Sequence, residues 1–281
     1  MTQILIDGKT NVYGIIGNPV SHSFSPNMHS NAFRHVGINS VYLPFPIEQS
    51  DLPQVLESFR VLGIQGFNVT IPYKEAIVPF LPEIDPAAKI LRSVNTVKRT
   101  KNGWKGYSTD GSGFLRALQE KGVNPVSQSV LLIGAGGAAR AIALAMVDAG
   151  IKELHIQNRT KSRAQELADL ILKRNRKIVL KINPKDIKCY DILINCTSIG
   201  MDGISCPVSD NLIAASKQVI DIIYNPSLTP LLKKARSRGI DCDNGIGMLL
   251  YQGIEAFEIW TGEKAPIEVM EKSLKKSLEF Q

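Results

Sequence analysis

The middle of the chain alternates short apolar segments with helix-like segments, and this alternation constrains the fold most. "SVLLIGAGG" (129–137) is an apolar run that ends in glycines, and "AARAIALAMVDAG" (138–150) has an apolar helical pattern with a glycine stop. The order continues with the strand-like "ELHIQNRT", "DILINCTS" and "QVIDIIYN" and the helix-like "SRAQELADLILKR" and "TPLLKKARSRG". Strands that alternate with helices of this length are typical of parallel βαβ units. We therefore expect a parallel sheet between about residues 125 and 244.

The N-terminal part of the chain alternates in the same way, which indicates a second α/β unit. A length of 281 residues also suggests two domains. "VNTVKRTKNGWKGYSTDG" places Asn-Gly between two strand-like runs, a pattern that predicts a hairpin. "GFLRALQEKG" is a helix that could bridge the two units, and the tail reads as two helices that pack back on the N-terminal domain. We predict one domain over residues 1–112, completed by 247–281, and a second over 113–246.

Composition and charge favour a protein that binds small anionic molecules. The formal net charge is +7, but the basic residues are scattered, and the densest run, "LKRNRK" (172–177), reads as the solvated end of a helix. No basic and aromatic residues interleave as in a stacking platform for bases, so we expect no nucleic-acid partner. No apolar run reaches about 18 residues, so we expect no membrane span. The four cysteines and four histidines lack zinc-ligand spacing, so we expect no metal.

The start of the chain, "MTQILIDGKTNVYGIIGNP", bears on the location of the protein. It has an acid and a strand-like pattern where a signal peptide has a basic start and a long apolar stretch. We therefore expect a cytoplasmic protein.

"GAGGAAR" (134–140) follows a predicted strand and opens a predicted helix, as a dinucleotide-binding loop does. Glycines permit a tight turn and a close backbone approach, and the helix N-terminus offers N–H groups to a phosphate. The candidate cofactor residues here are Gly134, Ala135, Gly136, Gly137 and Ala138. The alternatives are a tight turn without a ligand, or a site for another adenine-containing ligand such as a methyl donor.

The end of the next predicted strand distinguishes between the two nicotinamide cofactors. An NAD site usually places Asp or Glu here, to hold the ribose hydroxyls. This chain has Asn158, Arg159 and Thr160, with Arg163 one turn later. A guanidinium can bind a 2′-phosphate through charge-assisted hydrogen bonds, whereas a carboxylate would repel it. These residues indicate NADP, although a surface arginine near a helix start remains the alternative.

"NVTIPYKE" (68–75) gathers polar side chains around the end of a strand. Asn68, Thr70 and Lys74 could all face one polar molecule. An ammonium group such as that of Lys74 can protonate or hold a developing alkoxide, best when a carboxylate orients it. Asp110, in "GYSTDG", is a candidate for that carboxylate. Most Lys and Asp residues are solvated surface groups, and the sequence does not place these two together.

Several short motifs together resemble the shikimate dehydrogenases along almost the whole chain. They occur in family order and at compatible spacing: "GNPVSHSFSP" (17–26), "NVTIPYKE" (68–75), "SVNT" (93–96), "STDG" (108–111), "GAGGAAR" (134–140), "NRT" (158–160), "IYNP" (223–226) and "GIGMLLYQG" (245–253). The resemblance implies an α/β fold with a substrate domain, a Rossmann-type NADP domain and a cleft between them. It also implies reversible NADPH-dependent reduction of 3-dehydroshikimate to shikimate, in aromatic amino acid biosynthesis.

The resemblance also implies roles for individual residues. Lys74 and Asp110 match the catalytic pair of the family. The implied substrate-binding residues are Ser23, Ser25, Asn68, Thr70, Asn95, Tyr224 and Gln252, whose donors and acceptors suit a carboxylate and three hydroxyls. Ile222, Gly245 and Met248 match the nicotinamide end of the cofactor site. Structural roles remain open: N-capping for Ser23 and Ser25, backbone satisfaction for Asn68 and Asn95, and core packing for Tyr224, Ile222 and Met248.

Other readings of the sequence remain open. The nearest is a quinate/shikimate dehydrogenase that uses NAD or NADP. The family often has Asn where this chain has Ser108, which could change substrate preference. A non-catalytic dinucleotide sensor is a further alternative, although Lys74 and Asp110 are both present. We expect a monomer or a homodimer.

Overall fold

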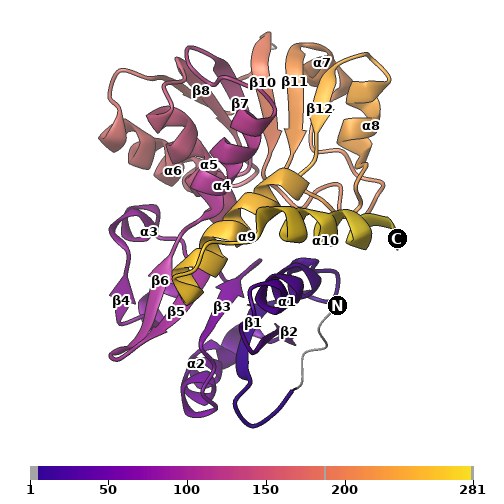
Figure 1. Ribbon diagram of the computed structural model, residues 1–281. Coiled ribbons are helices and arrows are strands. Elements are labelled where there is room, and N and C mark those ends of the chain that lie inside the picture. The colour runs from indigo at the N-terminus through magenta and orange to yellow at the C-terminus, as the bar shows by residue number, and fades with distance from the viewer. Residues whose placement is uncertain (1–5, 187, 280–281) are drawn as a thin grey trace. The chain divides into compact units, whose positions relative to one another are not determined.

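The computed structural model describes residues 6–186 and 188–279. The chain divides into two compact α/β units (Figure 1). Unit 1 comprises Met1–Thr109 and Gln252–Gln281, and unit 2 comprises Asp110–Tyr251. Asp110 is therefore the first residue of unit 2 in this division.

Unit 1 contains a six-stranded mixed sheet in the order β2-β1-β3-β5-β6-β4. Its strands are β1 (Asn11–Gly17), β2 (Ser40–Pro46), β3 (Gly66–Val69), β4 (Glu83–Ile84), β5 (Thr96–Thr100) and β6 (Gly103–Tyr107). β1 runs parallel to β2 and β3, whereas β5 is antiparallel to β3 and β6. The predicted hairpin is confirmed: β5 and β6 are joined at Asn102, and Gly103 has a φ of 113° that favours glycine.

The helices of unit 1 are α1 (Ser25–His35), α2 (Leu52–Val61), α3 (Pro86–Leu91) and α10 (Ile267–Glu279), with short 3-10 turns at Gln49–Asp51 and Val78–Phe80. Phe59 of α2 packs edge-on against Phe67 of β3, which in turn contacts Trp104 of β6. These rings form part of the hydrophobic core on one side of the sheet.

The tail helix α10 packs on α1, as expected from the absence of a partner strand. The side-chain amide of Asn27 donates to the backbone oxygen of Ser273 (3.1 Å) and to Oγ of Ser277 (2.9 Å). Helix α9 (Ile246–Thr261) begins in unit 2 and ends in unit 1, where Nε1 of Trp260 donates to the Val97 carbonyl (2.9 Å).

Unit 2 contains a six-stranded parallel sheet in the order β12-β11-β10-β7-β8-β9, which confirms the prediction. Its strands are β7 (Ser129–Ile133), β8 (Glu153–Gln157), β9 (Val179–Ile182), β10 (Tyr190–Asn195), β11 (Ser216–Asp221) and β12 (Asp241–Asp243). The central strand β7 is buried along its whole length, as is typical of a parallel sheet covered on both faces. The sequence did not predict β9 and β12, because these edge strands have only four and three residues.

The helices of unit 2 are α4 (Asp110–Glu120), α5 (Gly137–Asp148), α6 (Lys161–Arg174), α7 (Asp210–Ala214) and α8 (Pro230–Arg236). Helix α4 belongs to unit 2, where it packs closely on α5: a Cβ at Gly111 would lie 2.7 Å from the Ala141 carbonyl oxygen. Helix α6 ends at Arg174, and the charged residues that follow are exposed, as the basic run "LKRNRK" predicted.

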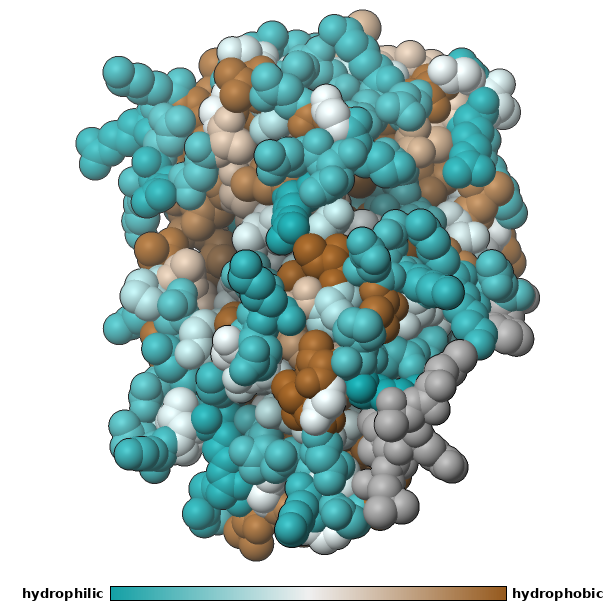
Figure 2. All heavy atoms as spheres, viewed as in Figure 1, coloured by the Kyte–Doolittle hydropathy of each residue, from teal (hydrophilic) through white to brown (hydrophobic). Residues whose placement is uncertain are grey.

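Polar and charged residues cover much of the face shown in Figure 2, with hydrophobic residues in smaller groups among them. Among the described residues, no helix combines the length and apolar character that a membrane span needs.

Candidate active site

The glycine-rich loop of unit 2 follows the carboxyl end of β7. Gly134 has a φ of 112°, and a Cβ there would lie 3.1 Å from Cγ2 of Thr197 and 3.2 Å from the Cys196 carbonyl oxygen. Gly136 is the N-cap of α5 and has no side chain with which to cap the helix. The first N–H groups of a helix lack intrahelical partners, so this end of α5 is suited to a phosphate. The residue set therefore fits a dinucleotide.

The predicted NADP-selecting residues follow β8, the neighbouring strand. Arg159, Thr160 and Arg163 are exposed, while Asn158 is half-buried. The side-chain amide of Asn158 donates to the Thr160 carbonyl (2.8 Å), so Asn158 shapes the turn that presents Arg159. Asn183, which the sequence analysis missed, supports the same turn by accepting from the Asn158 N–H (2.8 Å) and donating to its carbonyl (3.2 Å).

The three predicted nicotinamide-side residues lie in unit 2, around the ends of β11 and β12. Ile222 is half-buried and follows β11, and Met248 is 8% exposed on α9. Gly245 approaches Ile222 so closely that a Cβ at 245 would collide with the Ile222 carbonyl oxygen. The N–H of Gly245 also donates to the Ile223 carbonyl (3.1 Å). Glycine is therefore required here by a close backbone approach.

The carboxyl ends of β1 and β3 place Thr70 and Lys74 in unit 1. The Thr70 N–H donates to the Ile16 carbonyl (3.0 Å), and Gly17 leaves room for the Thr70 methyl group. Lys74 is half-buried in the turn after β3, and its carbonyl accepts from the Val94 N–H (2.8 Å). Gly17 was not among the predicted residues, although its place between a strand and Asn-Pro gave a signal.

Asn95, Thr109 and Gln252 form one buried network in unit 1. The Asn95 side chain accepts from the Thr109 N–H (2.7 Å) and donates to Oγ1 of Thr109 (2.8 Å) and Oε1 of Gln252 (3.2 Å). The Thr109 hydroxyl donates to the Gln252 carbonyl (3.1 Å). Thr109, fully buried, was missed although it stands in the "STDG" motif. The structure thus brings Asn95 and Gln252 together, as expected of residues that share a site.

Asn68 has a mainly internal role. Its Oδ1 accepts from the Tyr42 hydroxyl (2.7 Å), and its amide donates to the Asn95 carbonyl (3.1 Å) and to Oγ1 of Thr96 (3.1 Å). An amide has two N–H donors, so both are used within the protein. This geometry favours a structural role, in which Asn68 hydrogen-bonds to neighbouring groups of the protein, over donation of a hydrogen bond to substrate.

Ser23 and Ser25 lie after β1, at the start of α1. Ser25 is 2% exposed and Ser23 is half-buried, and the Ser25 N–H donates to Oγ of Ser23 (3.3 Å). The N-cap residue is Phe24, whose side chain makes no capping hydrogen bond, and Ser25 is the first residue of α1. Neither serine is therefore the N-cap residue, but the Ser23 hydroxyl satisfies the first N–H of the helix.

The catalytic pair predicted from the sequence is divided between the two units. Asp110 is 3% exposed at the first position of α4, where the helix dipole favours a carboxylate. Lys74 belongs to unit 1, and Tyr224, half-buried, follows β11 in unit 2. Their meeting around one substrate stays a prediction.

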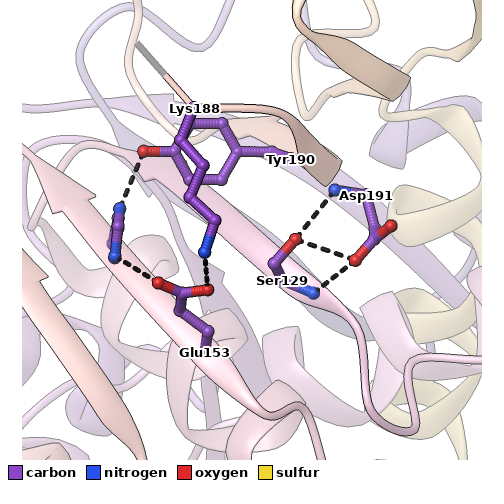
Figure 3. A network of polar contacts seen from close by, with 6 residues as sticks. Ser129, Glu153, Lys188, Tyr190 and Asp191 are labelled. Carbon is purple, nitrogen blue, oxygen red and sulfur yellow. Dashed lines mark hydrogen bonds and ion pairs between the residues drawn. The ribbon is translucent and has the colours of Figure 1, made fainter. Parts of the chain in front are cut away.

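The amino end of the unit 2 sheet carries a different polar network (Figure 3). Nδ1 of His155 lies 2.7 Å from the Tyr190 hydroxyl, and its Nε2 lies 2.8 Å from Glu153, which also pairs with Lys188. Beside it, Asp191 accepts from the N–H and the hydroxyl of Ser129 (both 2.8 Å). Burial lowers the pKa of His155. None of these residues was predicted to serve a site. Among the described residues, no group of three or more His, Cys, Asp or Glu could hold a metal ion.

Comparison with known proteins relates both units to shikimate dehydrogenases. Family models match at residues 15–97 (shikimate dehydrogenase substrate binding domain), 117–222 (shikimate / quinate 5-dehydrogenase) and 245–275 (shikimate 5′-dehydrogenase C-terminal domain). The shikimate dehydrogenase (NADP(+)) of Desulforamulus reducens is 41% identical, with 97% of each chain covered.

Two solved structures extend this similarity to the fold. A shikimate dehydrogenase in complex with NADP+ has a TM-score of 0.87 and 39% identity, with 98% of each chain covered. The Thermus thermophilus enzyme in complex with NADP(H) and shikimate has a TM-score of 0.86 and 32% identity, with 96% of this chain and 100% of that chain covered. The chain belongs to the shikimate dehydrogenase family.

Proposed function

We propose that this protein is an NADP-dependent shikimate dehydrogenase, which reversibly reduces 3-dehydroshikimate to shikimate. The observation that carries the proposal is the similarity over both units to relatives named as NADP(+)-dependent shikimate dehydrogenases. The proposal includes residues 1–112 with 247–281 as the substrate domain and 113–246 as the dinucleotide domain. It also includes a role in aromatic amino acid biosynthesis, a cytoplasmic location and a monomeric or homodimeric state.

Lys74 and Asp110 are the proposed catalytic residues. The chemistry that NADPH supplies when bound is a hydride, which reduces the ketone carbon. Negative charge then grows on the ketone oxygen, where the Lys74 ammonium donates a proton and stabilises the charge. Asp110 orients Lys74 and binds a neighbouring hydroxyl.

Substrate contacts are assigned mainly to residues of unit 1, with Tyr224 contributed by unit 2. Ser23 and Ser25 would receive the carboxylate, and Thr70, Asn95 and Gln252 the hydroxyls, with Tyr224 closing the carboxylate side. Asn68 supports these residues indirectly, because its amide donates to the Asn95 carbonyl and to Oγ1 of Thr96.

Cofactor contacts are assigned to residues at the strand ends of unit 2. The loop from Gly134 to Ala138 would hold the pyrophosphate. The exposed side chains of Arg159 and Arg163 would bind the 2′-phosphate, with Asn158 and Thr160 shaping their turn. Ile222, Gly245 and Met248 would contact the nicotinamide.

Initial rates on shikimate and quinate, each with NADP and with NAD, test the proposal. We expect the highest kcat/KM for shikimate with NADP. A quinate/shikimate dehydrogenase would oxidise both substrates, and a dinucleotide sensor would bind NADP without turnover. Either result would replace the proposed function.

A further inference from the structure

Asp221 is a fully buried carboxylate at the carboxyl end of β11, directly before the predicted nicotinamide-side residue Ile222. Its Oδ1 accepts from the Asn195 side-chain amide (3.0 Å) and from the Ile223 N–H (3.1 Å). Its Oδ2 accepts from the Thr229 hydroxyl (2.7 Å). Neither the sequence motifs nor the proposed mechanism uses this residue.

The partners of Asp221 connect two loops that follow neighbouring strands. Asn195 ends β10 and is fully buried; its amide also donates to the Ile199 carbonyl (3.2 Å), and its Oδ1 accepts from the Thr197 N–H (3.1 Å). Thr229, also fully buried, caps α8 by accepting from the Leu232 N–H (3.3 Å). Asp221 therefore joins the loop after β10 to both ends of the loop between β11 and α8.

The backbone that carries the proposed cofactor and substrate contacts is fixed by the same residues. The Ile222 N–H donates to the Asn195 carbonyl (3.0 Å), and the Ile223 carbonyl accepts from the Gly245 N–H (3.1 Å). Together with the bond from the Ile223 N–H to Asp221, these contacts hold residues 222 and 223 from three directions. Tyr224 is the next residue in the chain.

We propose that Asp221, with Asn195 and Thr229, is a positioning cluster that sets Ile222 for the nicotinamide and Tyr224 for the substrate carboxylate. This inference rests on the proposed function, because it assigns both contacts to shikimate dehydrogenase chemistry. A carboxylate suits the role, since it only accepts and can gather three donors from three chain segments. Burial raises the pKa of Asp221 to about 6, so the group is still mainly ionised at neutral pH.

The test compares Asp221→Asn with Asp191→Asn. Asp191 is a matched control because it is also largely buried and also accepts from a backbone N–H and a hydroxyl, at the other end of the same sheet. Both variants should lower the melting temperature. Asp221→Asn should in addition raise the Kd for NADPH and the KM for shikimate by about tenfold, the scale of one lost hydrogen bond to a charged group. Asp191→Asn should leave both constants within about twofold.

Thr229 supplies a second pair of variants in case Asp221→Asn does not fold. Thr229→Ser keeps the hydroxyl and should keep the wild-type constants, whereas Thr229→Val should raise the NADPH Kd and the shikimate KM. A lower melting temperature with both constants unchanged, in Asp221→Asn or Thr229→Val, would overturn the positioning role. Failure of the proposed function can be told apart from failure of the positioning role. If the proposed function is wrong, the wild-type protein will not oxidise shikimate. The NADPH titration of the variants would still show whether Asp221 positions Ile222.

Discussion

The unit 2 sheet has a half-buried aspartate, Asp191, at its amino end and a fully buried one, Asp221, at its carboxyl end, and the pKa values of the two groups shift in opposite directions. At the amino end, burial favours the neutral form of Asp191, but Lys217 and Ser129 outweigh it and hold the pKa well below its usual range. At the carboxyl end, burial dominates and raises the pKa of Asp221 to about 6, against the donors Thr229, Ile223 and Asn195. The ion pair between Asp191 and Lys217 (2.7 Å) is the chemical difference.

This difference separates an aspartate whose ionisation stabilises the fold from one whose ionisation costs stability. A lowered carboxyl pKa means that ionisation is more favourable in the folded state than in the unfolded state, and a raised pKa means that it is less favourable there. Perturbed groups retained against stability are typical of functional sites. In parallel α/β sheets, ligands bind at the carboxyl ends of the strands. The loops after β7, β8 and β11, which carry proposed cofactor residues, follow this rule, whereas the network of Figure 3 lies at the amino end of the same sheet.

Lys74→Ala extends the comparison to unit 1, where Lys74 follows the carboxyl end of β3. Of all the variants, it should have the largest effect on activity. Loss of the proton donor should lower kcat by about 10²–10⁴-fold, because the developing alkoxide is no longer stabilised. NADPH binding should change far less, as measured by equilibrium titration. Equal losses in kcat and in NADPH affinity would count against the proton-donor role.

Arg159→Gln tests the carboxyl end of β8. The variant should lose about 10–100-fold of its preference for NADP over NAD in kcat/KM, since a hydrogen bond to the 2′-phosphate loses its charge assistance. Lys161→Gln is a control, because this exposed residue lies on the same turn outside the proposed set. An unchanged ratio of the two cofactors in Arg159→Gln would remove this residue from the site.

Asp191→Asn tests the amino end and should lower the free energy of unfolding at pH 7 by about 1–3 kcal/mol, with kcat unchanged. The pKa of Asp191 is lower in the folded state, so its stabilising contribution is complete above about pH 4 and is lost as the pH falls. Chemical denaturation should therefore show a smaller loss of stability in acid for the variant than for the wild type.

Asp221→Asn should change the pH dependence of stability with the opposite sign. The folded pKa of about 6 lies above the unfolded value, so ionisation of Asp221 lowers wild-type stability as the pH rises from about 4 to about 6. That decline should be absent in the variant. If ionisation of both aspartates changed the stability in the same direction, the contrast between the two ends of the sheet would be wrong.

Arg174→Gln should have the smallest effect. Arg174 pairs with Asp148 at 2.7 Å, but both side chains are exposed, and such pairs contribute little. The denaturation midpoint should shift by less than that of Asp191→Asn, and kcat should not change. A larger shift than for Asp191→Asn would show that exposed pairs, rather than the buried amino-end network, stabilise unit 2.

Much of this architecture could be predicted from the sequence, because it depends on local patterns. The apolar run before Gly134 and the glycine stop after α5 define a βα unit, and Asn102–Gly103 defines a hairpin. The roles of Asn68 and Asp221 could not be predicted, since their partners Tyr42, Asn195 and Thr229 are distant in the sequence or carry no motif. The edge strands β9 and β12 were missed because strands of four and three residues are too short to show a clear period.

Hydride transfer from deuterated NADPH to 3-dehydroshikimate is the direct test of the proposed reaction. The purified protein is incubated with NADPH that carries deuterium at the transferable position, and the product is analysed by NMR. We expect shikimate with deuterium on the ring carbon that carried the ketone. Unconsumed cofactor, or shikimate without the label, would contradict the proposed reaction.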